Sequence, residues 1–176
     1  DAGVMVSDDH AVVEAARQQR QYGWGEQRIS QLAGINSRLD ELQAAILVEK
    51  LAFLDQDNAR RREIGAQYDS ALGTTDIQIP ERRDGVLHVF HQYVIQSESR
   101  NALGEFLAEQ GIGTSIHYPQ AVHQQPAYKD RLIGREYLPV TERMVSRILS
   151  LPMYPQLTND QMVMICNVLQ EWSSSK

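Results

Sequence analysis

Residues 37–72 read SRLDELQAAILVEKLAFLDQDNARRREIGAQYDSAL, and this stretch carries the strongest structural signal in the chain. Apolar side chains recur along it at helical intervals, and its first serine and first aspartate stand three residues apart, as in a capping box. Alanine, leucine, glutamate and lysine favour helix throughout. The stretch predicts one long helix from about Arg38 to Leu72, bent near Gly65, that crosses the molecule and supports elements on both sides.

The segments on either side alternate between strand and helix patterns. Upstream, the sequence predicts a strand at residues 4–6, a helix at 10–21 and a glycine-rich loop at 23–35. Downstream, it predicts strands at residues 86–96 and 114–116 and helices at 100–110, 140–149 and 158–172. We therefore expect an α+β fold in which a small sheet of antiparallel type is covered by helices and preceded by the long helix.

The composition is that of an ordinary globular protein. The 176 residues carry a net charge of −6 and contain a single cysteine, Cys166, which excludes an internal disulfide framework and a multi-cysteine metal cluster. No apolar run approaches the roughly 20 residues that span a bilayer, and the acidic balance argues against nucleic acid as a partner. We expect a soluble, cytoplasmic protein that binds neither membrane nor nucleic acid.

The first residues suggest that the chain continues a longer protein. The sequence opens at Asp1, without methionine, and runs directly into the apolar segment of residues 4–6. A buried strand needs neighbours that satisfy its backbone groups. We therefore expect a portion that precedes Asp1, the alternative being a chain whose start has been trimmed.

The histidines do not predict a metal site. His88 and His91 stand three residues apart in a predicted strand and so point to opposite faces. His117 and His123 flank a proline-containing loop, but no third ligand stands nearby in the sequence. Cys166 lies in an apolar run and is expected in the core rather than as a nucleophile.

The chain has three lysines, at positions 50, 129 and 176. Lys50 follows a glutamate on the predicted long helix, Lys129 lies in a polar loop and Lys176 ends the chain. None stands in the apolar setting that suits a lysine forming a covalent bond with a carbonyl compound. We predict no catalytic lysine in this chain.

The segment Gly34-Ile35-Asn36-Ser37-Arg38 places an amide, a hydroxyl and a guanidinium at the start of the predicted long helix. Free backbone N–H groups and the positive end of a helix dipole bind phosphate or carboxylate. Asn36 can donate to a phosphate oxygen, and Arg38 can hold a carboxylate through two hydrogen bonds. The alternative is that Asn36 and Ser37 only cap the helix.

Motifs along nearly the whole chain, in order, resemble those of one enzyme family. They are Arg20-x-Tyr22-Gly23, GINSRLDELQAAIL at residues 34–47, HVFHQYV at 88–94, GIGTSIHYP at 111–119, HxQPAY at 123–128 and LPMYP at 151–155. These motifs closely resemble the DegT/StrS-type family of nucleotide-sugar aminotransferases. Enzymes of that family depend on pyridoxal 5'-phosphate (PLP) and have the aspartate-aminotransferase fold, which is fold type I.

The resemblance implies that the chain has three parts. Residues 1–36 resemble the end of the large PLP-binding domain, residues 37–72 a long connecting helix, and residues 73–176 the whole C-terminal small α+β domain. The lysine that holds PLP covalently is expected upstream of Asp1, so this chain is expected to contain no catalytic residue. Alone, it is expected to be inactive and to bind no PLP.

The resemblance also implies roles for five residues in a homodimer whose active site is shared between subunits. Asn36 resembles the residue that reaches the PLP phosphate of the neighbouring subunit, and Tyr22 one that projects toward the neighbour's active site. Arg38 resembles a residue that holds a substrate carboxylate or the sugar nucleotide. His117 and Tyr118 resemble a loop that closes over the substrate, the alternative for His117 being a loop histidine bonded to backbone.

For the intact enzyme the resemblance implies transfer of an amino group from glutamate, through PLP, to a keto-deoxyhexose linked to a nucleotide diphosphate. It slightly favours a 3-keto over a 4-keto sugar. Two other hypotheses stay open. One is a short non-catalytic protein that binds a nucleotide sugar or serves assembly; the other is a relative that dehydrates its substrate because another residue replaces the lysine. The encoded sequence before Asp1 separates the enzyme from the short protein.

Overall fold

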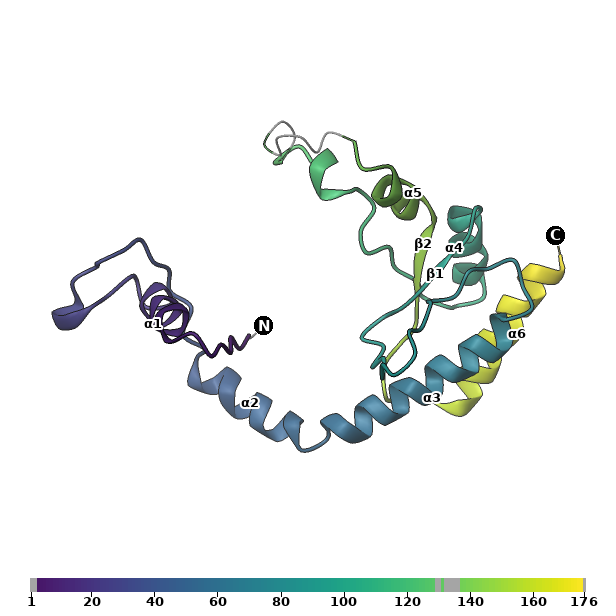
Figure 1. Cartoon of the computed structure of the whole chain (residues 1–176). Coiled ribbons are helices and arrows are strands. Elements are labelled where there is room, and N and C mark those ends of the chain that lie inside the picture. Colours follow the sequence, from purple (N-terminus) through teal and green to yellow (C-terminus); the bar gives the residue numbers. More distant parts are fainter. Residues whose placement is uncertain (1–2, 129–130, 132–136, 176) are drawn as a thin grey trace. The chain divides into compact units, whose positions relative to one another are not determined.

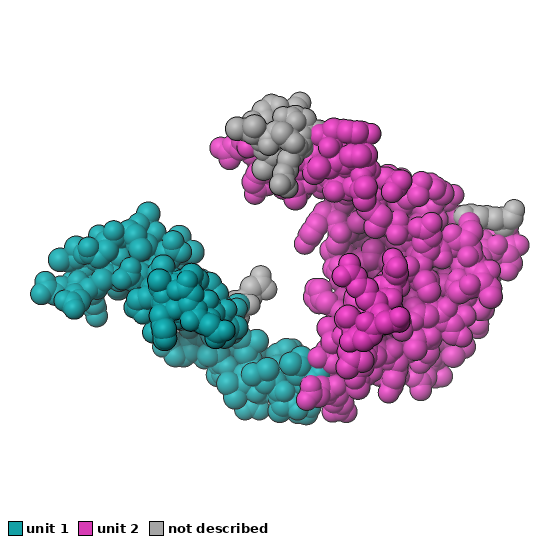
Figure 2. Space-filling view, viewed as in Figure 1, with its two compact units in different colours: residues 1–54 teal, residues 55–176 magenta. Residues whose placement is uncertain are grey.

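The computed structural model describes residues 3–128, 131 and 137–175. The chain divides into two compact units, unit 1 at residues 1–54 and unit 2 at residues 55–176 (Figure 2). It is rich in helix, and its described residues form a small sheet of two antiparallel strands (Figure 1). The α+β class predicted from the sequence is confirmed.

Unit 1 contains α1 (His10–Gln19), the short 3-10 helix η1 (Glu26–Arg28) and α2 (Glu41–Leu51). Asp9 caps α1, because its Oδ1 accepts hydrogen bonds from the backbone N–H groups of Ala11 and Val12 at 2.8 and 3.4 Å. Among the described residues of unit 1, only Gly23 is buried. The described part of unit 1 therefore has no apolar core of its own.

Large apolar side chains of unit 1 lie exposed. Val4 is 91% exposed and Leu42 is 74% exposed, and α2 carries further exposed apolar side chains along its length. The strand predicted at residues 4–6 is wrong, since these residues are irregular and pair with no described strand. A short segment without a partner strand among the described residues has no hydrogen-bonded ladder to keep it extended.

The single helix predicted from Arg38 to Leu72 is wrong at two places. Leu39 has a φ of 62°, in the left-handed region, so α2 begins only after Asp40. The chain leaves the helix again at residues 52–53 and resumes as α3 (Leu54–Leu72). Acidic side chains in the first turn of α3 favour a new helix N-terminus there.

Unit 2 is built on the two-stranded sheet. β1 (Tyr93–Gln96) and β2 (Ile148–Leu151) run antiparallel, with Tyr93 opposite Leu151. A single bridge joins Ser115 to Ser150 on the other edge of β2. The other elements of unit 2 are α3, α4 (Arg100–Glu109), the 3-10 helix η2 (Val122–Gln124), α5 (Pro139–Arg147) and α6 (Asn159–Ser174).

An apolar core joins the sheet of unit 2 to its helices. Ile95 of β1, Leu103 of α4 and Met162 of α6 are fully buried. Other buried members are Ile64, Tyr68, Leu72, Ile77, Phe90, Tyr93, Leu107, Ile112, Leu149, Leu151, Leu157, Ile165, Val168 and Leu169. Because each buried side chain of leucine size stabilises the fold by roughly 1.5–3 kcal/mol, this core accounts for the integrity of unit 2.

Specific contacts hold α3 on this core. Gly65 lets the Phe90 ring pack against the helix, since a Cβ there would lie 2.8 Å from the ring; α3 continues through this glycine, where a bend was expected. The Tyr68 hydroxyl donates to the backbone carbonyl that follows β2 at 2.9 Å, and the Tyr93 hydroxyl donates to Asp69 at 2.6 Å. Burial raises the pKa of both tyrosines far above the usual value.

Three other elements of unit 2 differ from their prediction. The strand predicted at residues 86–96 is shortened to β1, because Phe90 has a φ of 48° that interrupts an extended run. The helix predicted at residues 140–149 ends as α5, and its last two residues belong to β2. The strand predicted at residues 114–116 is reduced to the bridge at Ser115. Periodicity alone does not show whether such a short apolar run is a helix or a strand. In β2, the pairing with β1 makes it a strand.

The helices with clear end signals agree with prediction. α1, α4 and α6 each begin and end within two residues of the expected positions. Thr158 and Gln161 form a capping box at α6, in which the Gln161 N–H donates to Oγ1 of Thr158 at 3.2 Å and the Thr158 N–H donates to Oε1 of Gln161 at 2.9 Å. Within the described part of the chain, no helix has the length and apolar character needed to cross a membrane.

Candidate functional site

The segment that contains Asn36 is held against the end of α1. Backbone hydrogen bonds of 2.8 to 3.0 Å join residues 35–37 to residues 19–22. Gly34 permits this approach, because a Cβ there would lie 2.0 Å from the backbone nitrogen of Gly23. Gly23 itself has a φ of 75°, in the region that favours glycine. Two glycines therefore fix the backbone on which Asn36 stands.

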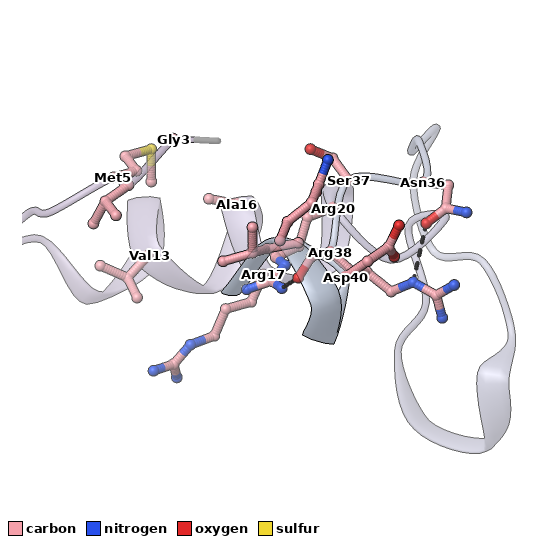
Figure 3. Close-up of a pocket in the computed structure, with 13 residues that line it drawn as sticks. Gly3, Met5, Val13, Ala16, Arg17, Arg20, Asn36, Ser37, Arg38 and Asp40 are labelled. Atoms are coloured by element: carbon pink, nitrogen blue, oxygen red, sulfur yellow. Dashed lines mark hydrogen bonds between the residues drawn. The ribbon is translucent and has the colours of Figure 1, made fainter. Parts of the chain in front are cut away.

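Three residues expected from the sequence to bind ligands, Tyr22, Asn36 and Arg38, lie together in unit 1. Nε of Arg38 donates to Oδ1 of Asn36 at 3.0 Å (Figure 3). The Arg38 guanidinium also lies 5.8 Å from the centre of the Tyr22 ring, and Tyr22 packs against Trp24. Because Oδ1 is engaged, the amide NH2 group of Asn36 stays available to donate to a ligand.

The sequence predicted that this segment lies at the start of a helix. This prediction is wrong. α2 begins at Glu41, so Asn36, Ser37 and Arg38 precede it in irregular chain. Asp40 and Glu41 occupy the helix start, where negative side chains meet the positive end of the dipole. Neither the helix dipole nor a capping role therefore explains Asn36 and Ser37.

A hollow of about 850 Å³ lies beside the segment, within unit 1 (Figure 3). Its polar lining includes Asn36, Ser37, Arg17, Arg20, Arg38 and Asp40. Arg20 donates to the backbone carbonyl of Arg38, and this contact restrains the guanidinium of Arg20 at the wall. The hollow is therefore lined by three arginines and one carboxylate.

The donor set of this hollow fits a phosphate group. Guanidinium, amide and hydroxyl groups all donate hydrogen bonds, and the arginines outnumber the single carboxylate. No described lysine lines it: Lys50 is exposed on α2, and Lys129 and Lys176 lie outside the described residues. The described part of unit 1 thus offers non-covalent phosphate binding without an amine for a covalent bond.

The other two residues expected to bind substrate, His117 and Tyr118, lie in unit 2. Nδ1 of His117 shares a hydrogen bond of 2.9 Å with Oγ of Ser150, and the Tyr118 ring stands edge-on to the imidazole. His117 lines a hollow of about 190 Å³ together with His91 and Ser115. The alternative of a histidine bonded to backbone is wrong, because the partner of this ring is a side chain.

His123 is buried and forms a second polar contact of unit 2. Its Nε2 lies 3.0 Å from Oε1 of Glu142, which also accepts a hydrogen bond from the backbone N–H of Leu138 at 3.1 Å. The hydrogen bond with His123, and after it the one from Leu138, hold the pKa of Glu142 below its usual value. The contact ties η2 to the start of α5.

The remaining candidate groups are structural. Nδ1 of His88 accepts a hydrogen bond from the backbone N–H of Phe90 at 2.9 Å. Cys166 is a free thiol packed against the core, and burial raises its pKa. Over residues 3–128, 131 and 137–175, no group of three histidine, cysteine, aspartate or glutamate side chains gathers to hold a metal ion.

Residues that support these positions were not expected from the sequence. Arg61 of α3 donates at 3.0 to 3.4 Å to the backbone carbonyls of Phe90, His91 and Met153. These bonds join two segments that line the smaller hollow. A partial signal existed only for Arg20, which belongs to the same motif as Tyr22. An arginine on a polar helix and a serine in an apolar run, such as Arg61 and Ser150, carry no such signal.

Comparison with known proteins gives matches along the chain. The family model described as the DegT/DnrJ/EryC1/StrS aminotransferase family matches residues 1–170. A dTDP-3-amino-3,6-dideoxy-alpha-D-galactopyranose transaminase from Aneurinibacillus thermoaerophilus is 37% identical, over 97% of this chain and 46% of its own length. A pleiotropic regulatory protein from Geobacillus stearothermophilus is 36% identical, over 98% of this chain and 47% of its own length.

Solved structures share the fold. The crystal structure of DesV from S. venezuelae matches with a TM-score of 0.88 at 36% identity, over 96% of this chain and 46% of that chain. The chain thus spans about half the length of the curated relatives it matches.

Proposed function

Because this chain belongs to the DegT/DnrJ/EryC1/StrS aminotransferase family, we propose that it forms part of an enzyme that transfers an amino group from glutamate to a nucleotide-linked keto-deoxyhexose. One observation carries the proposal: Tyr22, Asn36 and Arg38 cluster in unit 1, and the lining of the adjacent hollow donates hydrogen bonds suited to an anion. PLP and a nucleotide sugar both carry phosphate groups, which such donors bind.

The residues of this cluster take distinct roles in the proposal. Asn36 donates from its amide to the phosphate of the PLP bound by the neighbouring subunit, and Arg38 restrains Asn36 through Oδ1. Arg38 keeps further N–H groups for a substrate carboxylate or for the sugar nucleotide. Tyr22 projects toward the neighbour's active site and restrains Arg38 with its ring. PLP, when bound, supplies the electron sink that amino transfer needs.

The chain is proposed to consist of three parts of the enzyme. Residues 1–36 end the large PLP-binding domain, residues 37–72 connect the domains as α2 and α3, and residues 73–176 form the small domain. His117 and Tyr118 belong to the loop that closes over the nucleotide sugar; Tyr118 is 69% exposed and so is open to contact. The lysine that binds PLP covalently comes from the rest of the enzyme, so this chain alone is inactive and holds no PLP.

We further propose a homodimer with a shared active site, working in the cytoplasm. The exposed apolar side chains of unit 1 support the dimer, because apolar side chains gathered along one helix are normally covered by another surface. The free thiol of Cys166 suits a reducing compartment. Sedimentation of the full-length enzyme as a monomer at every concentration would reject the dimer.

The amino acceptor is proposed to be a 3-keto rather than a 4-keto sugar. Support comes from the motif at residues 34–47 and from the Aneurinibacillus thermoaerophilus relative, whose name places the amino group at carbon 3.

A second candidate function is a non-catalytic protein that binds a nucleotide sugar or serves assembly. The regulatory name of the Geobacillus stearothermophilus relative favours it. Such a protein would bind the sugar nucleotide without amino transfer.

An assay of the full-length enzyme that contains this chain separates the two candidates. Supplied with PLP and excess glutamate, it is expected to release 2-oxoglutarate over many turnovers only when a nucleotide-linked keto sugar is present; without the sugar, release stops at about one equivalent per active site, because the amino group then stays on the cofactor. NMR of the product then identifies the aminated carbon. Amination at carbon 4 rejects the 3-keto acceptor but leaves the proposed amino transfer in place. If neither sugar receives an amino group, the enzyme proposal is rejected and the binding protein is favoured.

The cofactor contact is tested by Asn36→Asp in the full-length enzyme. The change keeps the shape of the side chain but replaces its NH2 donor with a carboxylate oxygen, which repels phosphate. We expect PLP to bind at least about tenfold more weakly, as measured by retention on dialysis. The matched control Asn101→Asp, on the exposed surface of α4, is expected to retain PLP. Equal retention in both variants removes Asn36 from the cofactor site.

A further inference from the structure

Ser150 lies within β2 and is only 6% exposed. Its backbone pairs with Val94 of β1 on one side. On the other side, its N–H donates to the Ser115 carbonyl at 2.7 Å, and its carbonyl accepts from the Ser115 N–H at 3.2 Å. Ser150 is therefore held by two different segments, and its side chain starts from a fixed backbone.

The side chain of Ser150 adds a third link to the segment of Ser115. Its Oγ shares the 2.9 Å hydrogen bond with Nδ1 of His117, two residues beyond Ser115. With Nδ1 engaged, Nε2 is the ring nitrogen left for a ligand, and it forms no hydrogen bond within the described part of the chain. A hydroxyl both donates and accepts, so the contact forms whichever ring nitrogen carries the proton.

The hollow beside His117 makes the direction of this ring important. Its lining consists of imidazole, amide, hydroxyl and apolar groups, and none of the described lining residues is lysine, arginine, aspartate or glutamate. Recognition there depends on hydrogen bonds, which weaken steeply when the donor is misdirected. A ring already fixed before binding also loses less conformational freedom when the ligand arrives.

We propose that Ser150 is a positioning residue: its buried hydroxyl fixes the imidazole of His117 so that Nε2 meets a polar, uncharged group of the nucleotide sugar. The inference rests on the proposed function, in which His117 contacts that substrate. Ser150 itself also lines this hollow, but the role proposed for it is to hold His117 and not to react with the substrate.

The first test is NMR of the 176-residue chain labelled with 15N-histidine. The chain has five histidines, and His117→Gln identifies the ring signals of His117. Ser150→Ala is expected to change the 15N shifts of both His117 ring nitrogens toward those of a free imidazole, while the other four histidines keep theirs. Ser150→Thr, which keeps a hydroxyl, is expected to leave His117 as in the wild type.

Two variants guard this test against a change in folding. Ser146→Ala removes the hydroxyl of an exposed serine that donates to the Arg143 carbonyl within α5, and it is expected to leave the His117 signals unchanged. Ser150→Cys nearly keeps the volume of serine while weakening the hydrogen bond, so it replaces Ser150→Ala if that variant does not fold. His117 signals that stay at their wild-type positions in the folded Ser150→Ala or Ser150→Cys variant overturn the proposal.

The second test measures kinetics of the full-length enzyme. Ser150→Ala is expected to raise the KM for the nucleotide sugar about three- to tenfold, with a smaller change in kcat. The His117→Ala variant is expected to show a KM at least as high, and adding Ser150→Ala to it is expected to change KM no further, because Ser150 acts through His117. Additive effects of the two changes, or a wild-type KM in Ser150→Ala, overturn the proposal. An unchanged KM in His117→Ala rejects instead the proposed contact of His117 with substrate, and the NMR result still reports whether Ser150 fixes the ring.

Discussion

The two units of the chain are held together in different ways. Unit 2 packs α4 against β2 and α6 and buries side chains such as Leu103 completely. Unit 1 buries only Gly23 among its described residues and exposes apolar side chains such as Leu42. Its Asn36 segment is held by backbone hydrogen bonds and by two close-packed glycines instead of an apolar core.

This difference separates the apolar core from the larger hollow. Unit 2 contains the apolar core, whereas unit 1 contains the larger hollow with its three arginines. We infer that unit 1 needs a further apolar surface for its stability, which the rest of the proposed large domain and the proposed homodimer supply. Paired substitutions in the two units test this comparison.

Leu103→Ala is expected to have the largest effect. It removes a fully buried side chain from the core of unit 2 and should cost about 2–5 kcal/mol of unfolding free energy. The matched change Leu42→Ala, on α2, should cost less than about 0.5 kcal/mol because Leu42 is exposed. Urea unfolding at low protein concentration measures both. Equal costs would mean that Leu42 is buried in solution and that the two units do not differ in this way.

Arg61→Met is expected to have the second largest effect. It should lower the free energy of unfolding by about 1–3 kcal/mol, because three backbone carbonyls lose a charged donor. The control is Arg62→Met, the next residue of α3, for which the described part of the chain shows no hydrogen bond or ion pair. Urea unfolding gives the two costs, and hydrogen exchange locates the loss at residues 90–92. A control variant as unstable as Arg61→Met would show that the helix surface, not the carbonyl contacts, is responsible.

Helix caps allow a comparison of like with like, since each unit has one. Thr158→Ala removes the capping box of α6 and should cost about 1 kcal/mol in the unfolding of unit 2. Asp9→Ala removes the cap of α1 and should speed hydrogen exchange in α1 while the urea midpoint of unit 2 stays constant. A shift of that midpoint in Asp9→Ala would mean that the two units unfold together.

The smallest expected effect is on the acid stability of unit 2. Because the pKa of Glu142 is lowered in the fold, its ionised form stabilises unit 2 above the unfolded-state pKa, roughly 4.3. That contribution is lost as pH falls through the lower pKa of the folded state. Glu142→Gln should therefore lose less stability between about pH 5 and pH 3 than the wild type, measured by urea unfolding at each pH. Glu14→Gln, in an exposed pair with Arg17, should follow the wild-type curve; an unchanged acid slope in Glu142→Gln contradicts the assignment.

The sequence predicted the helices whose ends carry side-chain signals. Asp9 and Thr158 indicate where α1 and α6 begin, because the side chain of each accepts a hydrogen bond from a backbone N–H of the first turn. The break before α2 was not predictable, since Leu39 adopts a left-handed φ that leucine rarely takes. The first two residues of β2 fall within a predicted helix, because a short apolar run fits either pattern, and only the pairing with β1 settles the choice.

The candidate site was predictable where its residues are neighbours in sequence. Asn36 and Arg38 stand two positions apart, so their contact follows from local spacing. The contact between His117 and Ser150 joins residues 33 positions apart, and it depends on the register of strands that the sequence did not reveal. Long-range pairing of this kind is set by tertiary packing and leaves no local pattern.

Our central claim is that this chain supplies donors for a phosphate group but no amine that holds PLP covalently. The most direct test incubates the 176-residue chain with PLP, reduces it with borohydride and maps the labelled lysines by mass spectrometry. We predict slow labelling shared among Lys50, Lys129 and Lys176, no faster than in the urea-unfolded chain. Rapid, stoichiometric labelling of one of these lysines, abolished by urea, would contradict the claim.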